Sequence, residues 1–337
     1  MDKHYLTPLF SPQSVLVFAG NQEDAAAAFA QAKALYANLT AQRFNGEIRF
    51  VDIQTTGTLA DLALARADLA IIALPHTEVA AALEVAGRMK CKAALVISAG
   101  MGADLAADLK RIARRSGMHL LGPNCLGMQR PYIGLNASVA GTLAAKGPLG
   151  LVSQSGALTS SILDWAHSNG VGFSAVVSLG PNTVVDLADV LDFLAADAQT
   201  QSIVVYMEGI GNARRFMSAL RAAANAKPVV VLKAGRKPAG NAAAQTHSGT
   251  IVGSDDVFAA ALRRAGAVRV RSFVELFSAA KCLASRYRPV GKRLAIVTNG
   301  GGPGVLAADW VSELELHLAR LSPAVAEELK TKLSPLA

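Results

Sequence analysis

The sequence has no hydrophobic run that approaches the roughly 20 residues needed to span a membrane, and its strongest apolar segments, such as 202–207 and 228–232, are short. Its first residues lack the charged and then apolar pattern of a signal peptide. It has only three cysteines, far apart and without the spacing of metal ligands: Cys91, Cys125 and Cys282. Such sparse cysteines are typical of a reducing compartment rather than of a disulfide scaffold. These absences predict a cytoplasmic protein with no membrane span and no metal site.

Aromatic residues make up only 5% of the chain and charged residues 17%, whereas 52% of the 337 residues are hydrophobic. This composition excludes a disordered chain, and the length predicts two domains and part of a third. The net charge is +8. Runs of basic residues are typical of solvated helix faces, and they also attract a phosphate-bearing metabolite. No aromatic residues interleave with these runs, so we do not expect nucleic acid as a partner.

Short apolar strands alternate with alanine-rich helical stretches along the whole chain, which predicts an α/β protein with parallel sheets and helices on both faces. A Gly- and Pro-containing stretch at 141–150 is typical of a linker. We therefore predict three domains, 1–143, 147–287 and an incomplete third at 290–337. Because the third contains only about one and a half βα units, we expect the polypeptide or an obligate partner to continue beyond it.

Four loops share one pattern, in which Gly, Ser or Asn residues follow a predicted strand and precede a predicted helix: 122–127, 153–156, 178–182 and 299–304. Backbone N–H groups at a helix N-terminus suit a phosphate or a carboxylate. For any single one of these loops, a tight strand-to-helix turn is the favoured explanation. Four in tandem favour a protein that handles anions.

His247 stands in a Thr-His-Ser-Gly segment after an Ala- and Gly-rich stretch, and Glu208 ends a predicted strand. A neutral imidazole is a nucleophile near pH 7 and can carry a phosphoryl group. A carboxylate at the carboxyl end of a strand lies where doubly wound folds bind ligands, so Glu208 could orient the imidazole. The alternatives are an ordinary surface histidine and a solvated loop acid.

Taken together, seven motifs in order resemble the NDP-forming acyl-CoA synthetase family, which includes the alpha subunit of succinyl-CoA synthetase. They are Gly-Pro-Asn-Cys-Leu-Gly (122–127), Val-Ser-Gln-Ser-Gly-Ala-Leu (152–158), Val-Ser-Leu-Gly (177–180), Tyr-Met-Glu-Gly (206–209), Lys-Ala-Gly-Arg (233–236), Thr-His-Ser-Gly (246–249) with Gly-Ser-Asp (253–255), and Thr-Asn-Gly-Gly-Gly-Pro-Gly (298–304). The resemblance implies a Rossmann-like CoA-binding domain, a flavodoxin-like CoA-ligase domain and the start of a second one. It also implies that acyl-CoA, with a small acyl group such as acetyl, and phosphate give an acyl phosphate, whose phosphoryl group passes through a histidine to ADP or GDP.

The same resemblance assigns roles to individual residues. It implies that His247 is the phosphohistidine and Glu208 its stabiliser. Helix starts at Asn124-Cys125 and at Ser155-Gly156 would hold the phosphoryl group. The CoA diphosphate would bind near five residues: Gly20, Asn21, Ile97, Ser98 and Ala99.

The implied cofactor is coenzyme A, with ADP or ATP and Mg²⁺ held only by an ATP-grasp subunit or domain that this chain lacks. A homo- or hetero-oligomer is expected. Two features depart from the family pattern: the first turn carries Glu23 and Asp24 in place of a longer Gly-rich loop, and Pro181 stands where an Asn is usual.

Two alternatives remain at this point. Segments 134–138, 162–166 and 213–216 resemble the synthetase-like region that bacterial protein lysine acetyltransferases fuse to a GNAT domain, where it would sense acetyl-CoA. An NAD(P) dehydrogenase is the third hypothesis, and it is disfavoured because only Gly20 of a G-x-G-x-x-G pattern follows the first predicted strand.

Overall fold

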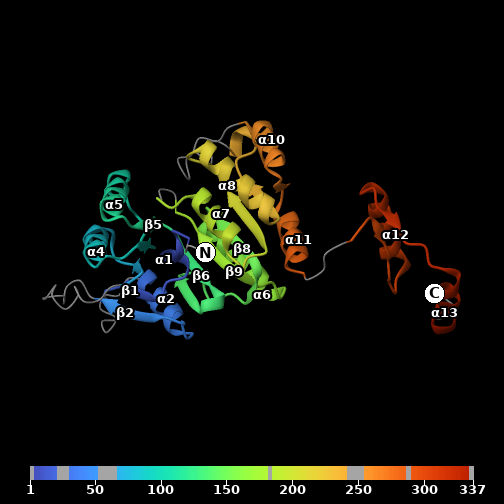
Figure 1. Cartoon of the computed structure of the whole chain (residues 1–337), viewed down its shortest axis with the longest axis horizontal. Coiled ribbons are helices and arrows are strands. Elements are labelled where there is room, and N and C mark those ends of the chain that lie inside the picture. The colour runs from blue at the N-terminus through green and yellow to red at the C-terminus, as the bar shows by residue number, and fades with distance from the viewer. Residues whose placement is uncertain are drawn as a thin grey trace. The chain divides into compact units, whose positions relative to one another are not determined.

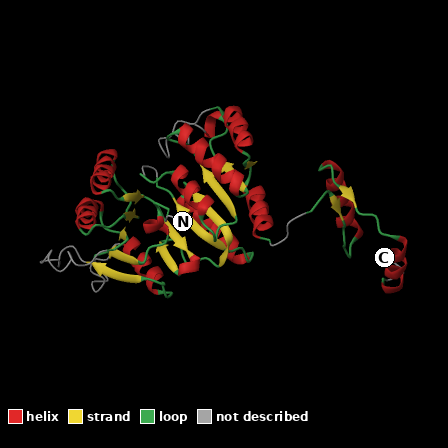
Figure 2. Cartoon of the chain, viewed as in Figure 1, coloured by secondary structure: helices red, strands yellow, loops and turns green. Residues whose placement is uncertain are grey.

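The computed structural model describes residues 4–20, 30–51, 67–180, 184–240, 254–285 and 290–333. The chain divides into two compact units, Met1–Ser285 and Arg286–Ala337 (Figure 1). The described strands and helices alternate along the chain, as the hydrophobic pattern predicts (Figure 2). The predicted domain ranges 1–143, 147–287 and 290–337 remain predictions.

The first sheet has five parallel strands in the order β2-β1-β3-β4-β5. These strands are β1 (Ser14–Phe18), β2 (Glu47–Val51), β3 (Leu69–Ile72), β4 (Ala93–Val96) and β5 (His119–Leu121). The order reverses between β1 and β3, and in open α/β sheets ligands bind outside the carboxyl ends of the strands at such a point.

Helices cover both faces of this sheet because its strands are apolar on both sides. The helices are α1 (Thr7–Phe10), α2 (Ala30–Thr40), α4 (His76–Arg88) and α5 (Ala103–Ser116). Helices α4 and α5 share one core with Leu16, Phe18, Ile72 and Val96 of the strands. Helices α1 and α2 pack on the opposite face.

The second sheet has seven strands in the order β12-β11-β10-β8-β9-β6-β7. Its parallel part consists of β8 (Lys146–Ser153), β9 (Phe173–Ser178), β10 (Ser202–Met207), β11 (Val229–Lys233) and β12 (Val268–Val270). The parallel order reverses between β8 and β10, which predicts a second ligand-binding edge at the carboxyl ends of these two strands.

Helices flank the second sheet as well. They are α6 (Gly156–Ser168), α7 (Leu187–Ala196), α8 (Ala213–Ala226), α10 (Asp255–Ala265) and α11 (Phe273–Ala284). Helices α6 and α11 share a core on one face, whereas α7, α8 and α10 pack on the other. The α7 side belongs to the same hydrophobic cluster as the α2 side of the first sheet, so one continuous core joins the two sheets.

A hairpin that the sequence did not predict extends the second sheet. Strands β6 (Gly127–Arg130) and β7 (Leu135–Ser138) pair antiparallel across the short helix η1 (Pro131–Ile133), and β6 pairs antiparallel with β9. These residues fall within the predicted first domain, yet they belong to the second sheet. The chain therefore passes from one sheet to the other immediately after β5.

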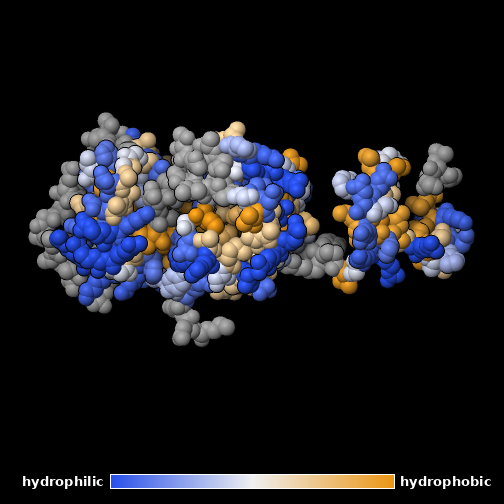
Figure 3. Space-filling model, turned by 90° about the horizontal axis from the view of Figure 1, so that it is seen from above, coloured by the Kyte–Doolittle hydropathy of each residue, from blue (hydrophilic) through white to orange (hydrophobic). Residues whose placement is uncertain are grey.

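The second unit contains two short parallel strands, β13 (Arg293–Leu294) and β14 (His317–Leu318), with helices α12 (Gly301–Glu313) and α13 (Pro323–Lys332). Apolar side chains remain exposed on this unit (Figure 3). Trp310 of α12 is also 61% exposed. In the part of the chain that the structure describes, no helix has the length and apolarity needed to cross a bilayer.

Candidate functional site

One loop, residues 122–126, lies at the carboxyl edges of both sheets in the first unit. On the side of the first sheet, the Asn124 N–H donates to the Ser98 carbonyl oxygen at 3.0 Å, and the Cys125 thiol donates to the Val96 carbonyl oxygen at 3.4 Å. On the side of the second sheet, the Leu126 N–H donates to the Ser178 hydroxyl at 3.2 Å. The loop therefore connects the two edges at which ligands are expected.

The expected helix start at Asn124-Cys125 is wrong, because strand β6 follows this loop. Tertiary pairing of β6 with β9 decides the conformation here. Asn124 adopts a left-handed backbone conformation with φ of +58°, and its N–H already has an acceptor in Ser98. A helix dipole therefore does not favour an anion at this loop, and the phosphate-binding role of Asn124 and Cys125 remains a prediction. Burial raises the pKa of the Cys125 thiol to about 12, so this side chain is neutral at pH 7.

The predicted helix start at Ser155-Gly156 is confirmed. Ser155 is the N-cap of α6, and its hydroxyl accepts from the Leu158 N–H at 3.4 Å. The first turn leaves the N–H groups of Gly156 and Ala157 without an intrahelical acceptor, which suits an anion. A Cβ on Gly156 would lie 3.0 Å from the Leu126 side chain, so this helix start abuts the loop 122–126.

The end of β9 packs against the same loop. A Cβ on Gly180 would collide with the Pro123 carbonyl oxygen, which only glycine avoids. The Leu179 N–H donates to the Ser153 carbonyl oxygen at 2.8 Å. Three of the four predicted loops thus meet in the first unit, although residues 181–182 of the third lie outside the described residues. The fourth loop, 299–304, belongs to the second unit.

Glu208 follows β10 and is only 7% exposed, which excludes the alternative of a solvated loop acid. Burial, with the charge of Glu208 and its hydrogen bond from the Tyr206 hydroxyl, raises the pKa of Tyr206 to about 12. Tyr206 is therefore a neutral donor at pH 7. His247 lies outside the described residues, as does Asn21.

Gln154 was not predicted as a site residue, although it stands within the motif 152–158. Its side-chain oxygen accepts from the N–H groups of Glu208 at 2.6 Å and Gly209 at 3.2 Å, and its side-chain nitrogen donates to the Gly209 carbonyl oxygen at 2.9 Å. One amide thus joins the ends of β8 and β10 at the point where the strand order reverses. A polar side chain with both donor and acceptor in a strand-to-helix turn is the signal that could have indicated it.

The predicted CoA-binding residues of the first sheet lie at its carboxyl edge. Ile97 and Ser98 are fully buried, and the Ser98 hydroxyl accepts from the Leu74 N–H at 2.9 Å, so this side chain joins the ends of β3 and β4. Ala99 is partly exposed, as is Gly20 at the end of β1. A Cβ added at the neighbouring Gly100 would meet nothing within 4 Å, so the loop after β4 opens into free space.

Lys233 ends β11 and is almost completely buried. Its ammonium donates to the Ala234 carbonyl oxygen at 3.0 Å and lies 5.2 Å from the centroid of the Phe258 ring. Burial lowers the pKa of Lys233, and the charges of Arg269 and Arg236 also lower it, while Asp255 opposes the shift. This cation is therefore held by backbone carbonyl oxygens within the protein.

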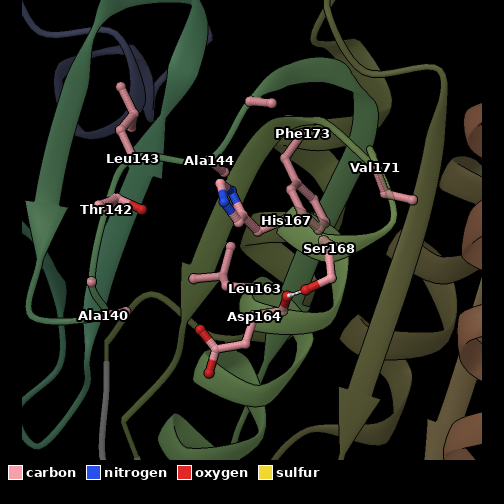
Figure 4. Close-up of a pocket in the computed structure, with 13 residues that line it drawn as sticks. Ala140, Thr142, Leu143, Ala144, Leu163, Asp164, His167, Ser168, Val171 and Phe173 are labelled. Atoms are coloured by element: carbon pink, nitrogen blue, oxygen red, sulfur yellow. Dashed lines mark hydrogen bonds between the residues drawn. The ribbon is translucent and has the colours of Figure 1, made fainter.

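Two hollows lie at the opposite, amino edges of the sheets. One of about 260 Å³ lies between residues 140–145 and the end of α6, where the Ser168 hydroxyl donates to the Asp164 carbonyl oxygen and the His167 ring lies beside Ala144 (Figure 4). The other, of about 580 Å³, is lined by residues at the amino ends of the first-sheet strands, among them Asp68, Lys92 and His119. Within the described ranges, no group of three or more His, Cys, Asp or Glu side chains is arranged to hold a metal ion.

Comparisons with known proteins fit this arrangement. A family described as "CoA binding domain" matches residues 45–131, and one described as "Succinyl-CoA ligase like flavodoxin domain" matches residues 146–283. The subunit alpha of an ADP-forming acetate–CoA ligase I from Pyrococcus furiosus is 36% identical over 331 residues, covering 93% of this chain and 71% of that protein. The chain belongs to the NDP-forming acyl-CoA synthetase family. The Rossmann-like CoA-binding domain and the flavodoxin-like CoA-ligase domain predicted from the motifs are thereby confirmed.

Other members of the family are similar over shorter fractions of their length. An ADP-forming acetate–CoA ligase I from Archaeoglobus fulgidus is 43% identical over 269 residues, which is 78% of this chain and 39% of that protein. The chain thus spans about two fifths of that relative. In structure, a dinucleotide-forming acetyl-coenzyme A synthetase 1 from Ca. Korarchaeum cryptofilum, in complex with phosphate and ADP, matches with a TM-score of 0.87 at 29% identity, over 98% of this chain and 74% of that one.

Proposed function

We propose that this chain is the CoA-binding and phosphohistidine part of an NDP-forming acyl-CoA synthetase. In the proposed reaction, phosphate attacks the thioester of a small acyl-CoA such as acetyl-CoA, which gives an acyl phosphate and free CoA. The phosphoryl group moves to the imidazole of His247 with release of the carboxylate, and then to ADP, which gives ATP. The relatives that are named as ADP-forming acetate–CoA ligases support this reaction.

The single observation that carries the proposal is the loop 122–126, which is hydrogen-bonded to the carboxyl edges of both sheets. CoA bound along Gly20, Asn21, Ile97, Ser98 and Ala99 would then end close to the second edge. There the N–H groups in the first turn of α6, which begins at Ser155-Gly156, would hold the phosphoryl group together with Asn124 and Cys125. The buried carboxylate of Glu208 would stabilise the cationic phosphoimidazole.

The partners and surroundings are proposed on the same basis. An ATP-grasp subunit or domain would hold ADP and Mg²⁺, and the assembly would be a homo- or hetero-oligomer. The three domain ranges and a cytoplasmic location belong to this proposal. The relatives named above are ligases, and they do not support the fused GNAT alternative that segments 134–138, 162–166 and 213–216 suggested.

The test uses the purified chain with an ATP-grasp subunit of a related acetate–CoA ligase, acetyl-CoA and inorganic phosphate. We expect one acid-labile phosphate per chain by intact mass, absent in His247→Asn and retained in the control His167→Asn, whose histidine is exposed at the opposite edge. Calorimetry measures CoA binding in parallel. Binding of CoA without any phosphorylation of the wild type would overturn the synthetase reaction and favour an acetyl-CoA sensor.

A further inference from the structure

Two residues contact Glu208. Gln154 follows β8, and Tyr206 belongs to β10, the strand that ends just before Glu208. The Gln154 side chain binds the backbone of Glu208 and Gly209. The Tyr206 hydroxyl interacts with the Glu208 carboxylate, which contributes to the raised pKa of Tyr206. We propose that Gln154 and Tyr206 are positioning residues that fix where the Glu208 carboxylate lies. This inference rests on the proposed function, because it assumes that Glu208 acts on the phosphoimidazole.

The hydrogen-bond partners of the Gln154 side chain allow only one orientation of its amide group. Two N–H donors, those of Glu208 and Gly209, face the oxygen, and the Gly209 carbonyl faces the nitrogen at 2.9 Å. A flipped amide would place its own N–H₂ group against two donors and its oxygen against a carbonyl, so the three partners define the amide. The backbone N–H of Gln154 also donates to the Tyr206 carbonyl oxygen at 3.1 Å, which continues the pairing of β8 with β10.

The hydrogen bonds of the Gln154 side chain lie just beyond the last paired residues of β8 and β10, where the two chains diverge. Parallel strands on the two sides of a reversal send their connections to opposite faces of the sheet, which opens a crevice between their ends. The Gln154 side chain crosses that crevice. The backbone of Glu208 is thereby tied to the turn that begins α6, which supplies the proposed phosphate-binding N–H groups.

Tyr206 restrains the side chain rather than the backbone. Its ring is stacked on Phe273 with centroids 6.2 Å apart, and the residue is only 7% exposed. This packing restrains the phenol, which is neutral at pH 7 and can therefore donate to the Glu208 carboxylate. Backbone and carboxylate are thus fixed by two different residues.

The decisive variants are Gln154→Met, which keeps an unbranched side chain of similar length without hydrogen bonds, and Tyr206→Phe, which removes only the hydroxyl. The control is Gln129→Met. Gln129 is another buried glutamine whose amide makes three hydrogen bonds, to the Ser138 hydroxyl, the Thr142 carbonyl oxygen and the Ala144 N–H, all on the side away from Glu208. Gln129→Met therefore removes as many buried hydrogen bonds as Gln154→Met does, but it leaves the crevice between β8 and β10 unchanged.

Two measurements are made on each variant in the presence of the ATP-grasp subunit. The first is the rate of the full reaction with acetyl-CoA, phosphate and ADP. We expect kcat to fall on the order of 100-fold in Gln154→Met, because a misplaced group costs rate of that size, and about tenfold in Tyr206→Phe, with KM for acetyl-CoA changed less than about twofold in both. The second is backbone amide exchange of a peptide that spans 206–211. Exchange is expected to accelerate in Gln154→Met alone, since Tyr206→Phe leaves the backbone bonds in place.

The outcomes separate this inference from the proposed function. Unchanged exchange at 206–211 in Gln154→Met, or an equal loss of kcat in Gln129→Met, would overturn the positioning role even if the wild type is an active synthetase. An inactive wild type with no phosphate on His247 would overturn the proposed function, while the exchange measurement would still decide whether Gln154 holds the Glu208 backbone.

Discussion

The strand that follows the loop 122–126 is anchored by a buried ion pair, and removing one partner gives a sharp prediction. Arg130 at the end of β6 binds Asp197 after α7 through two hydrogen bonds, of 2.9 Å and 3.3 Å, with side chains that are 4% and 10% exposed. The guanidinium also donates to the Ser174 carbonyl oxygen at 3.1 Å and lies over the Phe193 ring. We expect Asp197→Asn to destabilise the first unit.

The expected size follows from the burial of the pair. An uncompensated buried charge costs about 3–5 kcal/mol, whereas losing an exposed pair costs about 1 kcal/mol or less. With a denaturant slope of about 3 kcal/mol/M in urea, the loss moves the unfolding midpoint down by about 1–1.7 M. Burial acts to raise the pKa of Asp197, but the hydrogen bond and charge of Arg130 outweigh it and lower that pKa below its ordinary value of 3.8. The stabilisation is therefore complete above pH 3.8 and is lost as the pH falls through the lower, folded-state pKa.

The assay uses the two tryptophans of the chain, one in each unit. In a Trp310→Phe background, the fluorescence of Trp165, which is stacked on Phe277 with centroids 4.4 Å apart, reports on the first unit alone. Urea unfolding at pH 7 is compared for this background with and without Asp197→Asn. The same comparison with Arg130→Met completes a double-mutant cycle.

A midpoint shift below about 0.3 M would refute the reasoning, because it corresponds to roughly 1 kcal/mol, the value for an exposed pair. So would an equal loss from Asp197→Asn in the Arg130→Met background, since no unpaired guanidinium remains there to be penalised. At pH values below the folded-state pKa, the difference in stability between the chain with Asp197 and the Asp197→Asn variant must disappear.

Two further predictions concern packing and reactivity. Gly180→Ala should lower the free energy of unfolding by about 1–3 kcal/mol, because the added Cβ collides with the Pro123 carbonyl oxygen. The control Gly211→Ala, where the added Cβ meets nothing within 4 Å, should change that free energy by less than about 0.5 kcal/mol. Equal effects of the two substitutions in urea unfolding would contradict the close approach at Gly180. Iodoacetamide at pH 8 should label the exposed Cys282 and leave Cys125 unmodified until the chain unfolds, because burial raises the pKa of Cys125 to about 12. Mass spectrometry of tryptic peptides measures the labelling of each cysteine.

The hydrophobic pattern predicted the central strands well, because strands buried on both faces form continuous apolar runs between glycines. It missed the hairpin β6–β7 for a physical reason. Its residues Gly127–Ser138 include Pro131 and Gly134, show no clean alternation, and are ordered by pairing with β9, which is a tertiary interaction. That omission led directly to the wrong helix start at Asn124-Cys125.

The candidate site was predicted in part. Motif spacing located Ser155-Gly156 and Glu208, because the chain features that form a strand-to-helix turn are local. Gln154 could not be assigned a role from the motif, since its contacts with Glu208 and Gly209 join two strands that are about 50 residues apart in sequence. A motif shows which residues accompany one another, but it does not show which atoms are joined.

The loop 122–126 determines how far apart the carboxyl edges of the two sheets lie, because it is hydrogen-bonded to both of them. Asn124 and Cys125 of this segment are tied to the end of β4, and the next residue, Leu126, is tied to the end of β9. The short stretch 124–126 thus holds the two edges close together, and a ligand that bridges them has to match that separation. Inserting or deleting a single residue here would change the size of ligand that fits while leaving every strand of both sheets in place.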